Sequence, residues 1–309
     1  MVALESIEKL FGTTGIITNL FLLHLIINKS SPTFGAYKYL MIFTSVFEIV
    51  YAAVDIIVTP RIFTHGSAYF IVASADKTIL PTWALSYSLI LYIVSFGTAM
   101  AVFAVHFMFR YLVLSGDLVW TNEKSSKLNH LSELVQLNFQ KDTYFGFYFY
   151  YTDSNGLKIW SWWYIGGAFV ASLILLVSLS IMFYFGVKCY KALSELTSLT
   201  SQVSAKCRSL QNQLFYALVL QTAIPLALMH LPASITVLHC FADSSFETLG
   251  VFLPATIAMY PAIDPLPNMI IISDYREAII EYFSLFCTSR KTKISSQLKT
   301  IATNAVMVF

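Results

Sequence analysis

Charged residues are scarce in this chain. Only 12% of its 309 residues are Asp, Glu, Lys or Arg, whereas soluble domains carry about 25%. Hydrophobic residues make up 57%, with 25 Phe and 18 Tyr among them. This composition excludes a water-soluble globule and predicts a polytopic membrane protein whose general partner is the lipid bilayer.

Cysteine is also rare, and the common catalytic patterns are missing. The four cysteines are scattered without metal-ligand spacing. The chain has no nucleophile–base pair, HExxH motif, phosphate loop or nucleotide fingerprint. We therefore expect no enzyme activity and no catalytic residue, and we expect no metal, cofactor or nucleic-acid partner.

Apolar runs of at least 18 residues recur along the chain. Each is long enough to cross about 30 Å of hydrocarbon as a helix. The six runs are residues 10–27, 40–59, 82–109, 162–185, 214–237 and 249–272. We predict that they form one all-α membrane domain over residues 1–309. Residues 111–161 instead form a polar segment, in which no stretch is apolar enough to span a bilayer.

The placement of Lys and Arg indicates which ends of the spans face the cytoplasm, because cytoplasmic loops carry the excess. In the first half, Lys29, Lys38 and Arg110 on one side outweigh Arg61 and Lys77 on the other by a modest margin, which places the N-terminus outside. In the second half, basic residues 188–208 and the tail 276–309 predict a cytoplasmic C-terminus. The two halves fit one topology only if the chain crosses the membrane between residues 111 and 161.

The last apolar run contains an unusual motif, residues 261–267 with the sequence PAIDPLP, followed by SDYR at residues 273–276. Prolines remove backbone donors inside the helix, and a carboxylate at membrane depth normally faces other helices. The segment resembles the seventh helix of the nematode serpentine receptor class r (Str) chemoreceptors. These are seven-transmembrane G-protein-coupled receptors with a similar PAxDPLP…YR pattern.

Other segments carry the same resemblance over nearly the whole chain. GAYKYLM at 35–41 is similar to the family's entry into helix 2, and HFMFRY at 106–111 to its helix 3 exit. Residues 144–156 resemble its second outer loop, and QTAIP at 221–225 its helix 6 bend. Family members carry a fourth helix where residues 115–137 are polar here. We therefore expect a seven-transmembrane bundle with helix 4 missing, lost through a mispredicted exon or a decaying gene.

The resemblance assigns roles to residues near the predicted cytoplasmic side. Arg110, beside Tyr111, is similar to the arginine with which many such receptors hold the inactive state and engage a G protein. The alternative is a snorkelling arginine that binds lipid phosphate. Pro225 would be the hinge of helix 6. Asp264, Tyr275 and Arg276 belong to the motif of the last helix, and an amphipathic helix follows on the inner leaflet.

Three carboxylates lie inside the predicted spans. Glu48 and Asp55 are seven residues apart and therefore share one helix face. Counting residues from the basic ends places Glu48 and Asp264 at similar depth. We hypothesise a polar cluster that makes the helix packing bistable, as an activation switch requires. The alternative is a static network that satisfies the proline breaks.

A candidate ligand-binding set lies in the outer halves of the spans. Its residues are mostly apolar with few polar groups, which suits a small odorant, although core packing is the alternative for each. The residues are Trp83, Tyr87, Leu91, Met229, Phe252 and Thr256.

The resemblance implies a function that the residues alone do not. It implies a chemosensory, olfactory-type G-protein-coupled receptor that detects a small-molecule odorant and signals through a heterotrimeric G protein. It also implies a multi-pass protein of the plasma membrane, in the ciliary membrane of chemosensory neurons. The alternatives are a non-functional or truncated receptor remnant and a six-span ligand-gated channel.

Overall fold

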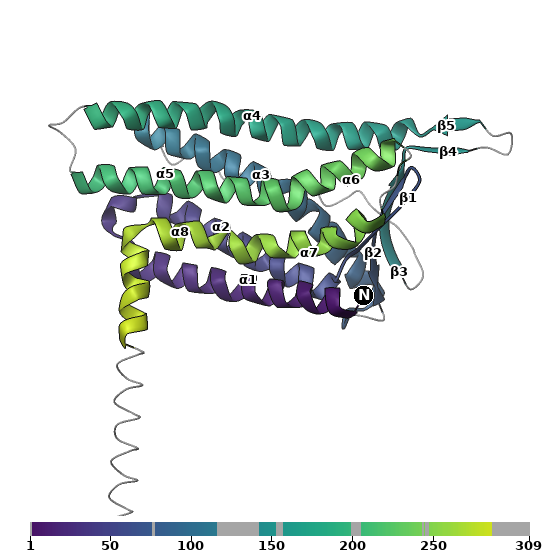
Figure 1. Ribbon diagram of the computed structural model, residues 1–309, viewed down its shortest axis with the longest axis horizontal. Helices are drawn as coiled ribbons and strands as arrows, with labels where there is room; N and C mark the ends of the chain where they lie inside the picture. Colours follow the sequence, from purple (N-terminus) through teal and green to yellow (C-terminus); the bar gives the residue numbers. More distant parts are fainter. Residues whose placement is uncertain are drawn as a thin grey trace, which may run out of the picture.

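Long helices lie side by side in a bundle, with a small β-sheet at one end (Figure 1). The computed structural model describes residues 2–75, 78–115, 142–152, 157–198, 205–242, 244 and 247–285. The helices are α1 (Val2–Lys29), α2 (Tyr37–Val58), α3 (Thr82–Ser115), α4 (Trp162–Ser198), α5 (Ala205–Pro225), α6 (Leu231–Phe241), α7 (Glu247–Ile263) and α8 (Pro265–Ile271). Two short turns, η1 (Pro32–Phe34) and the π-helical η3 (Leu226–His230), join α1 to α2 and α5 to α6.

Five helices among the described residues are long and apolar enough to cross a membrane, and α5, η3 and α6 form one of them as a continuous span, Ala205–Phe241. A sixth span exists if Gly250–Ile271 is taken with the helix Ser273–Leu285, which follows it at a bend of 97°. This mostly helical bundle confirms the predicted fold class. Residues 116–141, which hold nearly all of the polar segment predicted in place of helix 4, lie outside the described residues.

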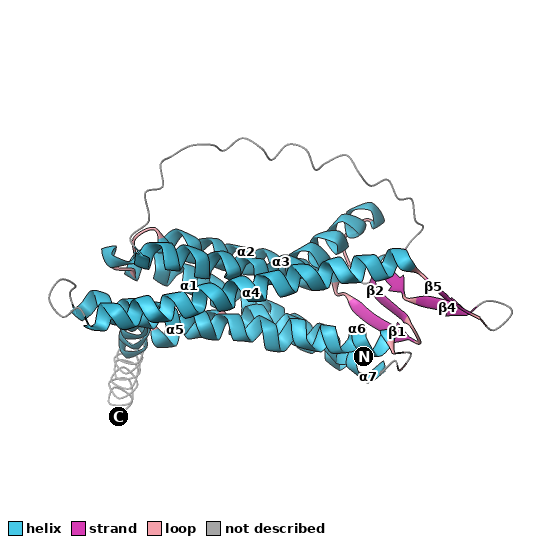
Figure 2. Ribbon diagram, turned by 90° about the horizontal axis from the view of Figure 1, so that it is seen from above, coloured by secondary structure: helices cyan, strands magenta, loops and turns pink. Residues whose placement is uncertain are grey.

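The two ends of the bundle differ in charge and structure. We call one the basic end, because Lys29, Lys38, Arg110, Lys188, Lys206 and Arg276 lie in or near the helix ends that meet there. We call the other the sheet end, where the N-terminus and the strands lie (Figures 1 and 2). Helix α3 ends at the basic end and β3 begins at the sheet end. The chain therefore passes from one end of the bundle to the other between residues 115 and 142.

The sheet covering one end was not predicted. Strands β1 (Arg61–His65), β2 (Ala68–Ser74) and β3 (Asp142–Tyr148) pair antiparallel in the order β1-β2-β3. A second pair joins β4 (Tyr150–Thr152) to β5 (Lys158–Trp160). In β2, buried and half-buried residues alternate, as expected for a strand with one face on a core. The three-stranded sheet packs against α3 and α7 and so closes this end of the bundle.

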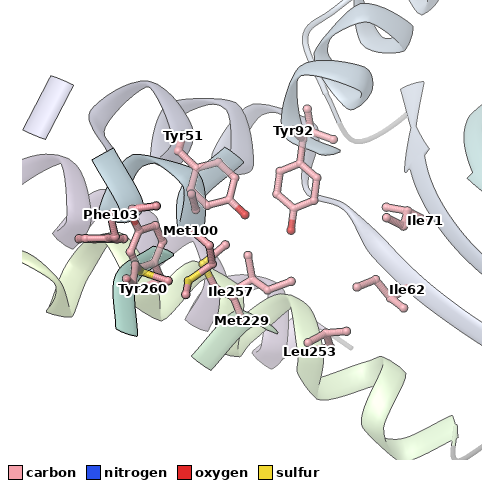
Figure 3. Packing of buried hydrophobic residues seen from close by; sticks show 14 of the residues in the cluster. Tyr51, Ile62, Ile71, Tyr92, Met100, Phe103, Met229, Leu253, Ile257 and Tyr260 are labelled. Carbon is pink, nitrogen blue, oxygen red and sulfur yellow. The ribbon is translucent and has the colours of Figure 1, made fainter. Parts of the chain in front are cut away.

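Two buried apolar clusters hold the helices together. The larger one extends from under the sheet along α3 to Phe107 and Cys189 near the basic end, and it includes the side chains in Figure 3. The smaller one, which includes Leu25, Met41, Leu214 and Tyr275, lies at the basic end between α1, α2, α5 and the helix after α8. Helix α4 is peripheral: 11% of its central residues are buried, against 33–44% in the other four spans.

Candidate functional site

The break between α7 and α8 is the first unusual feature of the bundle interior. Pro265 has no backbone N–H, so the carbonyl of Pro261 loses its helical donor. The side-chain amide of Asn19 on α1 donates to that carbonyl at 2.9 Å. Gly15 permits the approach, because a Cβ there would lie 3.1 Å from the carbonyl carbon of Pro261. The broken helix is thus repaired by a side chain from its neighbour.

Asp264 lies at this break, fully buried, and meets two other helices. Gln221 of α5 donates to its Oδ2 at 2.8 Å and to its backbone carbonyl at 3.2 Å. Glu48 of α2 accepts a hydrogen bond from the Tyr260 hydroxyl at 3.4 Å, and its carboxylate interacts with that of Asp264. Two interacting carboxylates in a dry interior resist carrying two charges, which favours a shared proton.

Three side-chain oxygens of this cluster accept no hydrogen bond from a fixed donor. They are Glu48 Oε2, Asp264 Oδ1 and Asn19 Oδ1, all buried, and a proton shared between the two carboxylates is what remains to pair them among the described residues. The structure therefore brings Glu48 and Asp264 together, as hypothesised from their depth. Asp55, on the same face of α2, lies about two helical turns away toward the sheet end.

The span formed by α5 and α6 is irregular next to this cluster. Pro225 ends α5 and is followed by the five-residue π-helical turn η3. The proline ring removes the donor for the carbonyl of Gln221, four residues earlier. Proline kinks and π-turns are where helices bend, and π-turns are frequent at functional sites. The span therefore has a weak point directly beside Asp264.

Arg110 ties α3 to the basic end of α5. Its side chain donates to the backbone carbonyl of Gln211, and to the Gln211 Oε1 atom at 3.1 Å. The guanidinium carbon lies 5.3 Å from the centre of the Tyr37 ring, a cation–π distance. Only 2% of Arg110 is exposed. The snorkelling alternative does not fit, because a side chain that reaches lipid phosphate must be exposed.

Residues around Arg110 link α3 to α2 and α4. His106 bridges the Thr44 and Tyr37 hydroxyls, at 2.6 and 3.3 Å. Tyr111 is half-buried, and its ring centre lies 5.5 Å from that of Phe185 on α4. Arg110 therefore lies in a packed polar layer that spans three helices.

The helix after α8 is fastened to the same region. Gln213 of α5 accepts a hydrogen bond from the Ser273 backbone N–H at 2.8 Å. Tyr275 is fully buried, stacks on Phe34 and shares a 2.7 Å hydrogen bond with Ser30. Arg276 donates to the carbonyl of Ile270 at 3.1 Å. Tyr275 and Arg276 of the recognition motif thus hold the turn at the end of the last span.

Three glutamines fix α5 to its surroundings, and none of them was singled out from the sequence. Gln211 meets Arg110, Gln213 meets Ser273, and Gln221 meets Asp264. A signal was present, because an amide side chain in an apolar span is costly unless it is hydrogen-bonded. Through Gln211 and Gln213, α5 is hydrogen-bonded at the basic end to α3 and to the helix after α8.

The predicted ligand-binding set is not brought together. Trp83, Tyr87, Leu91 and Phe252 are 69, 66, 45 and 54% exposed on the outer faces of α3 and α7. Met229 is fully buried in the core and Thr256 is half-buried. Four of the six side chains thus point away from the bundle interior. No group of three His, Cys, Asp or Glu residues that could hold a metal ion occurs in the described parts of the chain.

A bundle of helices long and apolar enough to cross a membrane, with buried polar side chains between them, defines a polytopic membrane protein. The family model described as "Serpentine type 7TM GPCR chemoreceptor Str" matches residues 4–128 and 120–280. The chain belongs to this family of G-protein-coupled receptors.

Curated relatives match along almost their full length. "G-protein coupled receptor str-217" of Caenorhabditis elegans is 31% identical over 325 positions, covering 94% of this chain and 93% of the relative. "Serpentine receptor class r-10" of the same species is 27% identical, covering 89% of this chain and 88% of the relative. The Caenorhabditis briggsae receptor of that name is 26% identical, covering 94% and 92%.

These matches also bear on the missing helix. Because 94% of 309 residues is about 290, about 35 of the 325 positions aligned with str-217 have no residue of this chain. The family model itself matches in two pieces that meet at residues 120–128. About 35 residues exceed the 20 or so that a transmembrane helix needs. The total number of positions without a counterpart is therefore large enough to hold one transmembrane helix.

Proposed function

We propose that this protein is a chemosensory receptor that detects a small-molecule odorant and signals through a heterotrimeric G protein. The observation that carries the proposal is the pair of Arg110 and Gln211, which closes α3 against α5 on the basic-end side of the Pro225 hinge. A closed pair beneath a hinge is what a two-state receptor needs in its resting state.

The direction of signalling follows from the charges. Cytoplasmic segments of membrane proteins carry the excess of Lys and Arg, and these residues gather at the basic end. We therefore place the basic end in the cytoplasm and the sheet end with the N-terminus outside. The proposed location is the plasma membrane, in the ciliary membrane of chemosensory neurons, where the sheet end would meet odorants.

The proposed motion is an outward swing of α5 about Pro225 and η3. The swing breaks the Gln211–Arg110 and Gln213–Ser273 hydrogen bonds and uncovers Arg110 for the G protein. A hydrogen bond to a charged group contributes about 1.5–3 kcal/mol and a neutral one about 1 kcal/mol. Together the two bonds set a gap of a few kcal/mol between closed and open states, within the range a ligand can shift.

The Glu48–Asp264 cluster would connect the hinge to the last span. Gln221, which binds Asp264, lies one turn before Pro225 and therefore close to the pivot. Moving α5 changes which hydrogen bonds Asp264 receives and so where the shared proton rests. The unpaired oxygens of the cluster give this rearrangement alternative positions, which a fully paired network would not have.

The test replaces Gln211 with alanine and measures basal nucleotide exchange on a co-expressed G protein. Gln211→Ala should raise basal exchange about fivefold, because the backbone carbonyl at position 211 still accepts from Arg110, and losing the side-chain acceptor alone removes about 1 kcal/mol from the closed state. Val219→Ala is the control, since Val219 is an exposed apolar residue of α5. If basal exchange is the same in the unchanged protein, in Gln211→Ala and in Val219→Ala at equal surface expression, the contact between Arg110 and Gln211 does not hold the resting state.

A second candidate function is a truncated receptor remnant. It is favoured by the roughly 35 positions of the alignment with str-217 that have no residue of this chain, and by the family match in two pieces, which overlap at residues 120–128. The two candidates separate by staining of an N-terminal tag on intact cells, since a remnant is retained in the endoplasmic reticulum. A messenger RNA that encodes an additional apolar run between residues 111 and 161 would show that the helix is missing because an exon was mispredicted.

A further inference from the structure

Buried polar groups without partners gather beneath the sheet. Tyr51 and Tyr92 are each 1% exposed, and apart from the contact between the two hydroxyls themselves, neither has a hydrogen-bond partner among the described residues. Asp55, one turn from Tyr51 on α2, is 5% exposed, and no hydrogen bond reaches its carboxylate from any described residue. Native proteins pair nearly all such groups with protein or water, so this concentration indicates a binding site.

The backbone at this place is also strained. Thr59, one turn beyond Asp55, has φ +42°, and it is the one non-glycine residue with positive φ in the described chain. A β-branched residue in this conformation is an outlier that the surrounding structure must impose. The Thr59 hydroxyl is likewise buried without a partner. Strain and unpaired groups coincide at the sheet end of α2.

The charges facing Asp55 are of its own sign. Glu8 of α1 repels the Asp55 carboxylate. Arg61 of β1, the cation of this region, forms an ion pair with Glu5, and no ion pair involves Asp55 within the described ranges. A buried carboxylate is costly unless it is paired. Left alone, such a carboxyl takes up a proton, whereas a cation bound beside it would keep it ionised and form an ion pair with it.

The walls of the site are aromatic and aliphatic. The Tyr51 and Tyr92 rings are stacked, with centres 5.6 Å apart. Figure 3 shows both hydroxyls directed toward the space between the two rings and Ile257, with Ile62 and Leu253 on its far side. Tyrosine rings attract cations through their faces. The surroundings therefore suit a small cation that carries an apolar body.

We propose that the site formed by Tyr51, Asp55 and Tyr92 binds a small protonated amine. The ammonium group donates to the Asp55 carboxylate and to the two tyrosine oxygens, and the alkyl or aryl body packs against Ile62, Ile71 and Leu253. The proposal deepens the receptor function by naming a ligand class and rests on it for any signalling consequence. Binding itself requires no G protein.

The experiment measures the thermal unfolding midpoint of the purified full-length protein in lipid nanodiscs. The probes are primary amines from propylamine to octylamine and 2-phenylethylamine, each compared with the alcohol of the same carbon skeleton. At least one amine should raise the midpoint by about 3 °C or more, and its alcohol should not, because binding only to the folded state stabilises it. No shift with any amine, or equal shifts with the alcohols, overturns the proposal.

Variants separate the site from general effects on folding. Asp55→Asn keeps the shape of the side chain and should abolish the amine shift, while the midpoint of the ligand-free protein stays nearly unchanged, because a buried carboxyl without a partner is already neutral. Tyr92→Phe should weaken the apparent affinity for the amine several-fold. Tyr87→Phe, an exposed residue of the same helix, should leave the shift unchanged. An amine shift that persists in Asp55→Asn contradicts the proposal.

Nucleotide exchange on a G protein, measured separately, distinguishes this inference from the proposed function. Amine binding that requires Asp55 but evokes no exchange supports the site and counts against the receptor function. Exchange evoked by neutral alcohols, with no stabilisation by amines, supports the receptor function and overturns the site.

Discussion

Buried polar side chains behave differently at the two ends of this bundle. At the basic end Arg110 meets Gln211, Gln213 meets Ser273, and Tyr275 meets Ser30, so each side chain has a partner on another segment. At the sheet end Tyr51 and Tyr92 are equally buried and meet only each other. The chain's own contacts thus close the basic end, while the sheet end holds the buried hydroxyls that the proposed amine would pair.

The Glu48–Asp264 cluster is intermediate, since one oxygen of each carboxylate is paired and the other is not. It also lies between the two ends, next to the helix break and the Pro225 hinge. A group of side chains with more than one way to pair is what can pass a change from the sheet end to the basic end.

The largest expected effect on nucleotide exchange comes from a substitution that opens the basic end. Arg110→Ala removes the contacts to both the side chain and the backbone carbonyl of Gln211, yet it should lower G-protein nucleotide exchange at least tenfold, because Arg110 is also proposed to contact the G protein. Surface staining of an N-terminal tag provides the check on expression. Basal exchange that rises in Arg110→Ala, as in Gln211→Ala, would mean that the arginine is only a latch.

Asp264→Asn and Glu48→Gln test the pair of carboxylates that lies between the two ends of the bundle. Each fixes a neutral side chain where the two carboxylates share a proton, and each should change basal exchange by about three- to tenfold. Because the groups interact, the double variant should differ from the sum of the single effects by about 0.5 kcal/mol or more. Unchanged surface expression and signalling in Asp264→Asn would rule out the switch.

Gly15→Ala tests how tightly α1 must approach the helix break. Its Cβ would lie 3.1–3.2 Å from the backbone of Pro261 and Ala262, which should lower the free energy of unfolding by about 1 kcal/mol. Gly97→Ala is the matched control, since nothing lies within 4 Å of a Cβ there. It should be neutral or stabilising. Equal thermal midpoints for the two variants would show that the approach has no energetic role.

The smallest expected effect concerns the hydrogen bond between Gln213 of α5 and Ser273. Gln213→Ala removes one neutral hydrogen bond, to the Ser273 N–H. It should raise basal exchange about twofold, less than Gln211→Ala, because a neutral bond contributes less than one to a guanidinium. A larger rise than in Gln211→Ala would move the main latch from α3 to the helix after α8.

The positions of the helices, and the common depth of Glu48 and Asp264, could be predicted from the sequence for physical reasons. Runs of apolar residues must span the bilayer, and rise per residue is fixed, so Glu48 and Asp264 could be placed at one depth by counting. The prolines of the last span likewise predicted a break. These features depend only on local sequence and helix geometry.

The inward faces of the helices could not be predicted in the same way. Trp83, Tyr87 and Leu91 lie on a helix that is apolar all round, so no amphipathic pattern shows which face is buried. The partners of Arg110 and Asp264 come from α5, more than 40 residues away in each case. The β1–β2 hairpin was detectable, since two strand-like runs flank the two-residue turn Gly66-Ser67, with Gly66 at φ +54°.

The central claim is that α5 opens at the basic end once its contact with Arg110 is lost. Spin labels at the half-buried native Cys207 of α5 and at Tyr39→Cys of α2, an exposed position, would report this distance by double electron–electron resonance. Cys189 and Cys240 are buried, and Cys287 is replaced by serine. Gln211→Ala should add a second, longer distance that is minor in the otherwise unchanged protein. One identical distance distribution in both proteins would contradict the account.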